Sequence, residues 1–109
     1  MNNGFKDREK AFEEKWAHDE SLRFKVEARR TKLVGLWAAG EMGLSSTDAE
    51  AYATSVVEAD MSEAGVEDVF RKIRADFDAK NIARSDHLIR SKLTELLAVA
   101  KDQVMHETK

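Results

Sequence analysis

The sequence predicts an all-α protein, a four-helix bundle preceded by a mobile N-terminal arm. The chain of 109 residues contains no proline and five glycines, and it is rich in residues that favour helices. Apolar residues recur at helical spacing in four segments joined by short connections, which favours an antiparallel bundle. The first eighteen residues contain aromatic side chains but no Leu, Ile or Val. We therefore expect a flexible arm over residues 1–18 and a bundle over residues 19–109.

The arm is expected to carry one narrow aromatic stripe on a charged helix. If it became helical, Phe5, Phe12 and Trp16 would lie within about 40° of one another. Burying three large aromatic side chains stabilises by roughly 5 to 9 kcal/mol, and ordering about fifteen backbone residues costs at least as much. We therefore expect an arm that is mostly disordered when free and helical in the groove of a partner.

An alternative is that the arm folds back and extends the first helix of the bundle. This alternative is strongest for Trp16, which lies shortly before Leu22, and weaker for Phe5, which lies between Gly4 and a run of charged residues. Partner docking is the interpretation we favour. It makes Phe5 and Phe12 the main docking residues and Trp16 the hinge between arm and bundle.

The first helix of the bundle is expected to be the longest, from about Asp19 to a C-terminal cap at Gly43. The second helix opens with a capping box formed by Thr47 and Glu50, and it ends at Gly65. The inward positions of the first are Leu22, Val26, Leu33, Leu36, Trp37 and Gly40. Those of the second are Ala49, Tyr52, Ala53, Val56, Val57 and Asp60.

The third helix is expected from about Val66 to Asn81, a residue suited to the left-handed conformation that ends a helix. The fourth begins at Ser85, whose hydroxyl can cap a helix N-terminus. The third helix turns inward Val69, Phe70, Ile73 and Phe77. The fourth turns inward Leu88, Ile89, Leu93, Leu96, Leu97, Ala100 and Val104.

Two arginines, Arg29 and Arg30, border the expected core between Val26 and Leu33. The more favoured interpretation is that they pair with acids of a neighbouring helix, with Asp60 as the best candidate. The other is a basic notch that binds the phosphates of a nucleotide, although the chain has no glycine-rich phosphate loop. Trp37 is expected in the core, with a smaller chance of stacking on a base. The candidate nucleotide-binding residues are Lys25, Arg29, Arg30, Lys32 and Trp37.

Composition argues against several classes of function. The net charge of -3 gives no basis for general nucleic-acid binding. The chain has no cysteine, and His18, His87 and His106 fall in separate segments, so no metal site and no required cofactor are expected. No catalytic constellation can be placed, which makes an enzyme the least supported class. The longest apolar run, residues 36–40, is too short to span a bilayer, and the N-terminus lacks a signal-peptide pattern, so we expect a soluble, cytoplasmic protein.

Five sequence blocks, taken in order, resemble the alphaproteobacterial zeta subunit of the F-type ATP synthase. The resemblance covers nearly the whole chain, and it is more specific than any single motif because the blocks keep the order found in the family. Beyond about Ala79 the similarity is one of pattern. The blocks are Asp7–Glu13, Ala17–Asp19, Phe24–Arg30, Leu33–Ala39 and Glu67–Lys72.

The resemblance implies a regulatory subunit that binds the catalytic head of the synthase, at the cytoplasmic face of the inner membrane, and blocks ATP hydrolysis. It assigns the inhibitory role to the N-terminal arm, here Phe5, Arg8, Phe12 and Trp16. It also implies that ADP or ATP binds the bundle, without identifying the residues. Two alternatives remain open: a nucleotide-sensing bundle, and a scaffolding module with no inhibitory activity.

Overall fold

The described part of the chain is all-helical, which confirms the all-α part of the predicted fold class. A computed structural model describes the backbone of residues 4–59 and 66–107, and the side chains of these residues except 4–9 and Ala17. Every regular element in these ranges is an α-helix. The helices are α1 (Gly4–His18), α2 (Glu20–Glu41), α3 (Ser46–Ala59), α4 (Glu67–Ala79) and α5 (Asp86–Glu107).

The long helix α2 begins and ends where the sequence predicts. The Asp19 carboxylate accepts a hydrogen bond of 3.0 Å from the backbone N–H of Leu22, which caps the helix. Gly43, just beyond the C-terminus, has a φ of 75°, a left-handed conformation that glycine adopts without steric cost. Both caps are local features, because each depends on residues within a few positions of the helix end.

The termini of the later helices follow the same local rules, with one correction. Asn81 has a φ of 58°, and the Ser85 hydroxyl accepts a hydrogen bond of 3.1 Å from the N–H of Leu88, as predicted. The predicted capping box at Thr47 is wrong. The hydroxyl of Ser45 accepts the bond from the N–H of Asp48, at 3.3 Å, so α3 starts two residues earlier than Thr47 would allow.

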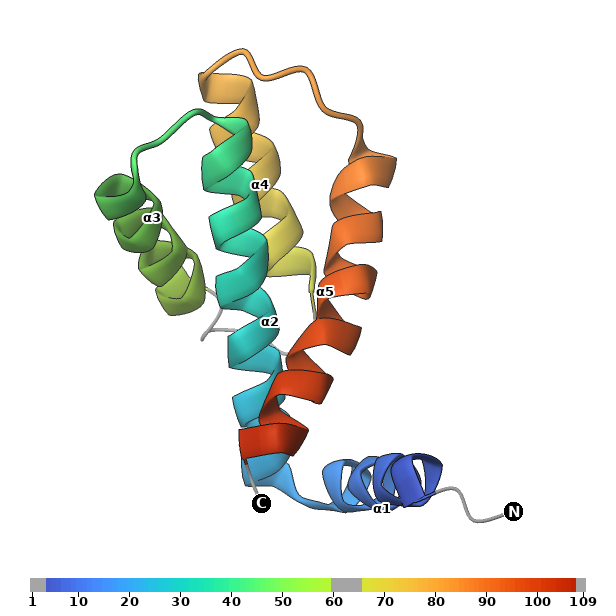
Figure 1. Cartoon of the computed structure of the whole chain (residues 1–109). Coiled ribbons are helices and arrows are strands. Elements are labelled where there is room, and N and C mark those ends of the chain that lie inside the picture. Colours follow the sequence, from blue (N-terminus) through green and yellow to red (C-terminus); the bar gives the residue numbers. More distant parts are fainter. Residues whose placement is uncertain (1–3, 60–65, 108–109) are drawn as a thin grey trace.

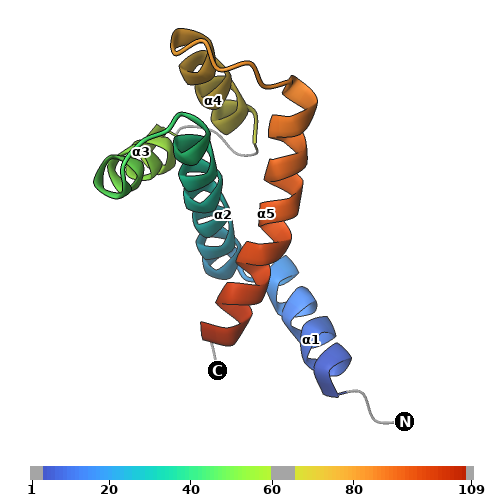
Figure 2. The same cartoon turned by 45° about the horizontal axis from the view of Figure 1, so that its top comes forward.

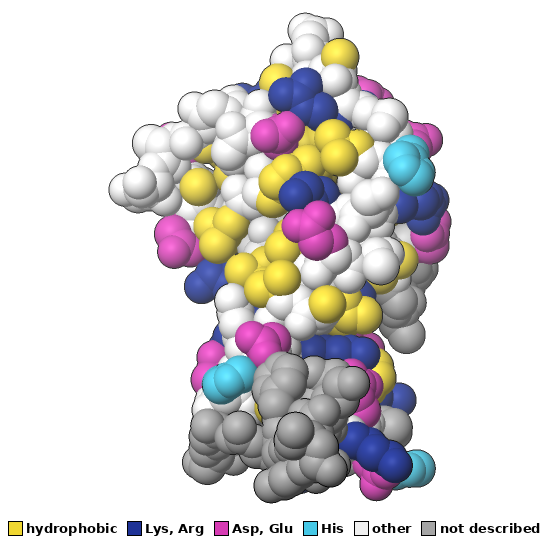
Figure 3. Space-filling view, turned by 45° about the vertical axis from the view of Figure 1, so that its right-hand side comes forward, with side chains coloured by type: hydrophobic (Ala, Val, Ile, Leu, Met, Phe, Trp, Pro, Cys, Tyr) yellow, Lys and Arg dark blue, Asp and Glu magenta, His cyan; other side chains and the backbone are white. Residues whose placement is uncertain are grey.

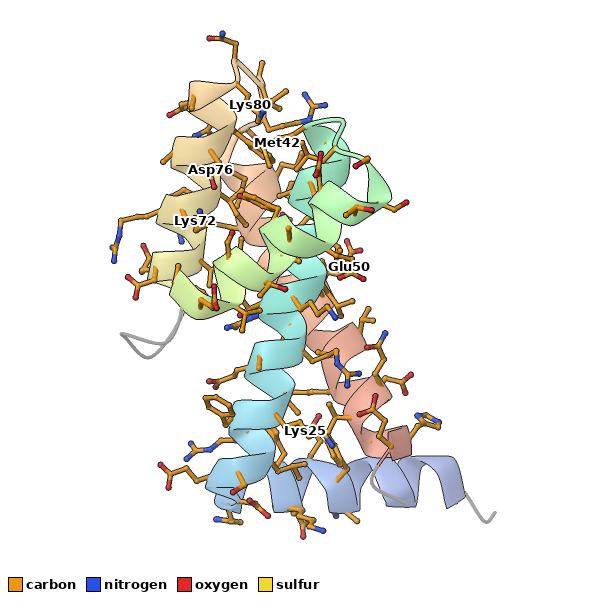
Figure 4. All side chains as sticks on the ribbon, turned by 90° about the vertical axis from the view of Figure 1, so that its left-hand side faces the viewer. Lys25, Met42, Glu50, Lys72, Asp76 and Lys80 are labelled. Carbon is orange, nitrogen blue, oxygen red and sulfur yellow. The ribbon has the colours of Figure 1, made fainter. Side chains whose placement is uncertain are left out.

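Helices α2 to α5 form one packed unit, which we call the helical body. Figure 1 shows α2 between α3 and α5, with α4 behind them, and successive helices run in alternating directions. Figure 4 shows α3 crossing α2 obliquely instead of lying along it. The crossing is close, because a Cβ atom added to Gly35 of α2 would lie 2.9 Å from the Cα atom of Ala53 in α3. Small residues at this point therefore determine how near the two helices approach.

Helix α1 does not join the helical body along its length. In Figures 1 and 2 it leaves the lower end of the body, beside the C-terminal end of α5, and points away from α3 and α4. Asp19 alone separates the last residue of α1 from the first residue of α2. The backbone of Asp19 is extended, with φ of -110° and ψ of 106°, so the two helices do not form one continuous rod.

The buried side chains divide into two clusters. The main cluster fills the upper part of the body between α2, α3, α4 and α5, and it holds the fully buried Phe77, whose ring meets that of Trp37 edge to face at 5.8 Å. The arm cluster lies at the lower end, between α1, α2 and α5. The buried members of the main cluster are Val34, Ala38, Val56, Val69, Phe70, Ile73, Phe77, Ile89 and Leu93. Those of the arm cluster are Phe12, Leu22, Val26, Ala100 and Val104.

Candidate functional site: the N-terminal helix and its contacts

The aromatic side chains of α1 pack on the lower end of the helical body. Phe12 is only 7% exposed and belongs to the arm cluster, and Trp16 is half-buried against the same cluster. This packing matches the alternative in which Phe12 and Trp16 fold back on the body, and the role of Phe12 in binding a partner stays a prediction. Leu22 and Val104 present an apolar surface at the end of the body, and burying a large aromatic on it stabilises by about 1.5–3 kcal/mol.

One lysine of the body contacts two residues of α1. The Lys101 Nζ atom lies 3.5 Å from the Glu13 Oε2 atom and 4.1 Å from the centre of the Trp16 ring. A cation over an indole face is attracted by the ring quadrupole, and the carboxylate adds an ion pair that is partly screened by water. Lys101 therefore holds α1 in place through one charged and one aromatic group.

The contact between α1 and the body is incomplete. The Trp16 indole N–H is buried and finds no hydrogen-bond partner among the described residues, which costs about 1–3 kcal/mol. A groove of about 330 Å³ runs between α1 and α5, with Phe12 and Glu13 on one side and Leu97, Lys101 and Met105 on the other. The interface between α1 and the body therefore contains a groove and one hydrogen-bond donor, the Trp16 indole N–H, without an acceptor among the described residues.

Two of the predicted arm residues have side chains outside the described part of the structure. Phe5 and Arg8 fall within the backbone limits of α1, but their side chains lie outside the described residues. Their assignment as partner-binding residues stays a prediction. Of the four predicted arm residues, Phe12 and Trp16 are the two whose side-chain contacts are described.

The structure pairs Lys25 and Arg29 with an acid at the end of α5. The two terminal guanidinium nitrogens of Arg29, Nη1 and Nη2, contact the Glu107 carboxylate at 2.6 and 2.8 Å, and Nη1 also donates a hydrogen bond of 3.0 Å to Gln103. The Lys25 Nζ atom lies 3.8 Å from the same carboxylate. The hydrogen bond from Arg29 holds the pKa of Glu107 below its usual value. These contacts favour the acid-pairing interpretation of Arg29, with Glu107 as its partner.

The remaining nucleotide candidates are not gathered around Arg29. Lys32 faces α3, where its Nζ atom lies 3.8 Å from Glu50, and Arg30 is buried. Trp37 packs in the main cluster. Figure 4 shows Lys25 near the lower end of the body and Glu50 well above it, on α3. Asp60, the partner predicted for the arginines, lies outside the described residues.

The hydroxyl group of Tyr52 makes a polar contact between α3 and α4. It donates a hydrogen bond of 2.7 Å to the Asp76 Oδ2 atom, and the Lys72 Nζ atom lies 3.1 Å from that same oxygen. Lys72 also lies 5.4 Å from the centre of the Tyr52 ring. Figure 4 shows Lys72 and Asp76 along one side of α4. Burial, and then the hydrogen bond to Asp76, raise the pKa of Tyr52 above its usual value.

The raised pKa of Tyr52 gives a prediction at alkaline pH. Unfolded tyrosine ionises near pH 10, so above about pH 10 the unfolded chain binds fewer protons than the folded one and the free energy of unfolding falls. Tyr52 is the single tyrosine of the chain, so tyrosinate absorbance reports on it alone. We expect tyrosinate to appear well above pH 10, or together with loss of the helical circular dichroism signal. Full ionisation near pH 10 in a folded protein would contradict this.

The outer surface of the body carries both hydrophobic and charged side chains. Figure 3 shows hydrophobic side chains gathered over the middle of one face, interrupted by charged ones. Among the described large hydrophobic side chains, Phe24 and Val99 are exposed, at 61% and 39%. Within residues 4–59 and 66–107, no group of three or more His, Asp or Glu side chains is placed to hold a metal ion. None of the described helices is long and apolar enough to cross a membrane.

The fold and these contacts define a small helical protein with a charged, aromatic N-terminal helix held on its surface by few side chains. The class of protein, a regulatory one, follows from the family that the sequence matches. Residues 1–103 match the sequence model of the family described as ATPase inhibitor subunit zeta. The chain belongs to this family, which is regulatory and not catalytic, and the resemblance drawn from the sequence is confirmed.

A solved structure supports the fold independently of the family match. A protein whose structure was determined in solution by NMR is 51% identical in sequence, with a TM-score of 0.70. The similarity covers 79% of this chain and 98% of the other. The comparison with curated proteins gives no match.

Proposed function

We propose that this chain inhibits ATP hydrolysis by the F-type ATP synthase, by inserting α1 into the catalytic head of the enzyme. The observation that carries the proposal is the way α1 is attached. It contacts the body through the arm cluster, while the main cluster contains no residue of α1 among its described members. Helix α1 can therefore leave the body without uncovering the core that holds α2 to α5 together.

The energetic balance of docking is close enough for a partner to compete with the body. Uncovering Phe12 and Trp16 costs roughly 3–6 kcal/mol. Release of the buried Trp16 N–H to water returns about 1–3 kcal/mol, and the freed side chains regain conformational entropy. A groove between subunits that buries a similar aromatic area, and offers the indole an acceptor, would bind α1 more tightly than the body does.

Inhibition would follow from the difference in size between α1 and the body. In this proposal the single helix enters a cleft of the rotary head, and the helical body acts as a four-helix plug that cannot follow. The inserted helix would obstruct the subunit movements that hydrolysis requires. Rotation in the direction of synthesis would reopen the cleft and release the helix, which would make the inhibition selective for hydrolysis. The protein would then act at the cytoplasmic face of the inner membrane.

The direct test compares ATP hydrolysis by purified synthase with the full chain and with a chain that begins at Asp19. We expect the full chain to inhibit and the shortened chain to lose inhibition. Circular dichroism must show that the shortened chain keeps the helical content of α2 to α5, because removing α1 uncovers Leu22 and Val26. Equal inhibition by the two chains would remove α1 from the mechanism.

Two other functions give different results in simple measurements. A scaffolding module would bind the synthase and leave hydrolysis unchanged with α1 intact. Binding of ADP or ATP to the body stays a prediction, because the described contacts separate its candidate residues and pair Arg29 with Glu107. Nucleotide would then shift the backbone amide signals of α2 in an NMR spectrum, and an unchanged spectrum at millimolar nucleotide would dismiss that site.

A further inference from the structure

We propose that the docked position of α1 is an autoinhibitory contact, with Lys101 of α5 as the latch that holds it. This inference rests on the proposed function, because it concerns the same helix. The side chains by which α1 would grip a partner are the ones that it buries against its own body. The body and the partner therefore compete for one face of α1.

The exclusion follows from the geometry of α1. Phe12 and Trp16 are four residues apart, so they lie on the same side of the helix. That side faces the body, where Phe12 is buried and Trp16 packs against the arm cluster. One helix face cannot contact two surfaces at the same time. We call the state with α1 docked on the body the closed state, and the state with α1 released the open state. Only molecules in the open state can bind the partner and inhibit.

Lys101 allows the docked state to be changed without altering α1. It belongs to α5, and its Nζ atom contacts both Glu13 and the ring of Trp16, at 3.5 and 4.1 Å. Replacing it removes an ion pair and a cation–π contact that exist only when α1 is docked. The face that α1 offers to a partner keeps its sequence. Lys101 is in this sense a positioning residue for the closed state.

Three features make the docked helix easy to release. The Trp16 indole N–H is buried without a hydrogen-bond partner among the described residues, and a groove of about 330 Å³ lies beside Phe12 and Lys101. The connection to α2 is the single extended residue Asp19. Opening thus requires a change at one junction, and it uncovers the arm cluster and not the main cluster.

The expected consequence is that weakening the latch strengthens inhibition. The apparent affinity of a partner is reduced by the fraction of protein that is competent to bind, so a larger open fraction lowers the concentration needed. The two contacts of Lys101 are exposed or partly exposed, and losing them should change the closed-to-open ratio by about 5- to 30-fold. We expect Lys101→Ala to inhibit hydrolysis at a concentration lower by up to about the same factor.

The test uses the full chain with Lys101→Ala, and Lys92→Ala as the matched control. Lys92 is also a lysine of α5 that contacts an acid and a tryptophan ring, at 3.3 Å from Glu95 and 5.9 Å from Trp37. Both of these partners lie in the helical body and neither lies in α1, so the loss of Lys92 should leave docking unchanged. Opening is measured separately by the fluorescence of Trp16 in a Trp37→Phe background, since the chain has two tryptophans. Release into water should shift the Trp16 emission to longer wavelength.

The two measurements separate failure of the latch from failure of the proposed function. A red shift together with more potent inhibition, seen for Lys101→Ala and not for Lys92→Ala, would support the latch. Unchanged Trp16 emission, or a red shift with equal or weaker inhibition, would overturn it, because the docked state would then be undisturbed or would not compete with the partner. If full and shortened chains inhibit equally, the proposed function itself is overturned, whatever the fluorescence shows.

Discussion

Replacing Phe77 by Ala is expected to lower the free energy of unfolding by about 3–5 kcal/mol. The side chain is fully buried at the centre of the main cluster, and its ring meets that of Trp37 edge to face. The substitution removes apolar contacts on several helices and leaves a cavity that they cannot fully close. A chain of this length has about 5–15 kcal/mol of stability, so the loss is a large part of the total.

Urea denaturation followed by circular dichroism measures this effect, with Phe24→Ala as the control. Phe24 is 61% exposed on α2, and its replacement should change the free energy of unfolding by no more than about 0.5 kcal/mol. The comparison holds the residue type constant and varies only its burial. Similar losses for the two variants would show that the main cluster does not hold the helices together.

Replacing Phe5, Phe12 and Trp16 together by Ala is expected to raise the concentration required for half-maximal inhibition by about 10- to 100-fold. The three side chains supply the aromatic face of α1, and each is worth about 1.5–3 kcal/mol when buried in a partner groove. Part of the loss is offset, because the variant also releases α1 from its own body. The expected fold-change in concentration is therefore smaller than the contribution of the three side chains to partner binding.

The triple variant should keep the fold of the helical body. Its substitutions lie in α1, outside the main cluster, so the circular dichroism spectrum should retain the signal of α2 to α5. Phe24→Ala again serves as the control, and it should inhibit like the unaltered chain. Inhibition by the triple variant at an unchanged concentration would mean that the aromatic stripe does not bind the synthase.

The parts of the fold that the sequence predicts well depend on short-range chemistry. The start of α2 at Asp19, its end near Gly43 and the start of α5 at Ser85 are each determined by a hydrogen bond or a left-handed backbone within a few residues. The same logic failed at Thr47 because Ser45 is an equally good cap two residues earlier. Local rules identify a helix boundary but do not choose between neighbouring hydroxyl residues.

The parts that the sequence did not predict are long-range pairings. Arg29 contacts Glu107, which is 78 residues away, and Lys101 contacts Glu13, which is 88 residues away. No periodicity shows that the end of α5 passes beside the start of α2. For the same reason the sequence offers no basis for preferring burial of Phe12 over docking on a partner, since the apolar surface that covers Phe12 comes from α2 and α5 together. Periodicity gives the face of each helix, whereas the contacts depend on how the helices cross.

The division of the buried side chains into two clusters has a consequence for the evolution of the sequence. Among the described residues, the two clusters share no member, although both draw on α2 and α5. Substitutions at distant sites without common partners have additive effects. Changes in the arm cluster can therefore tune how readily α1 is released, while changes in the main cluster tune how stably the helices fold. Inhibitory strength and stability would then be free to vary separately among related proteins.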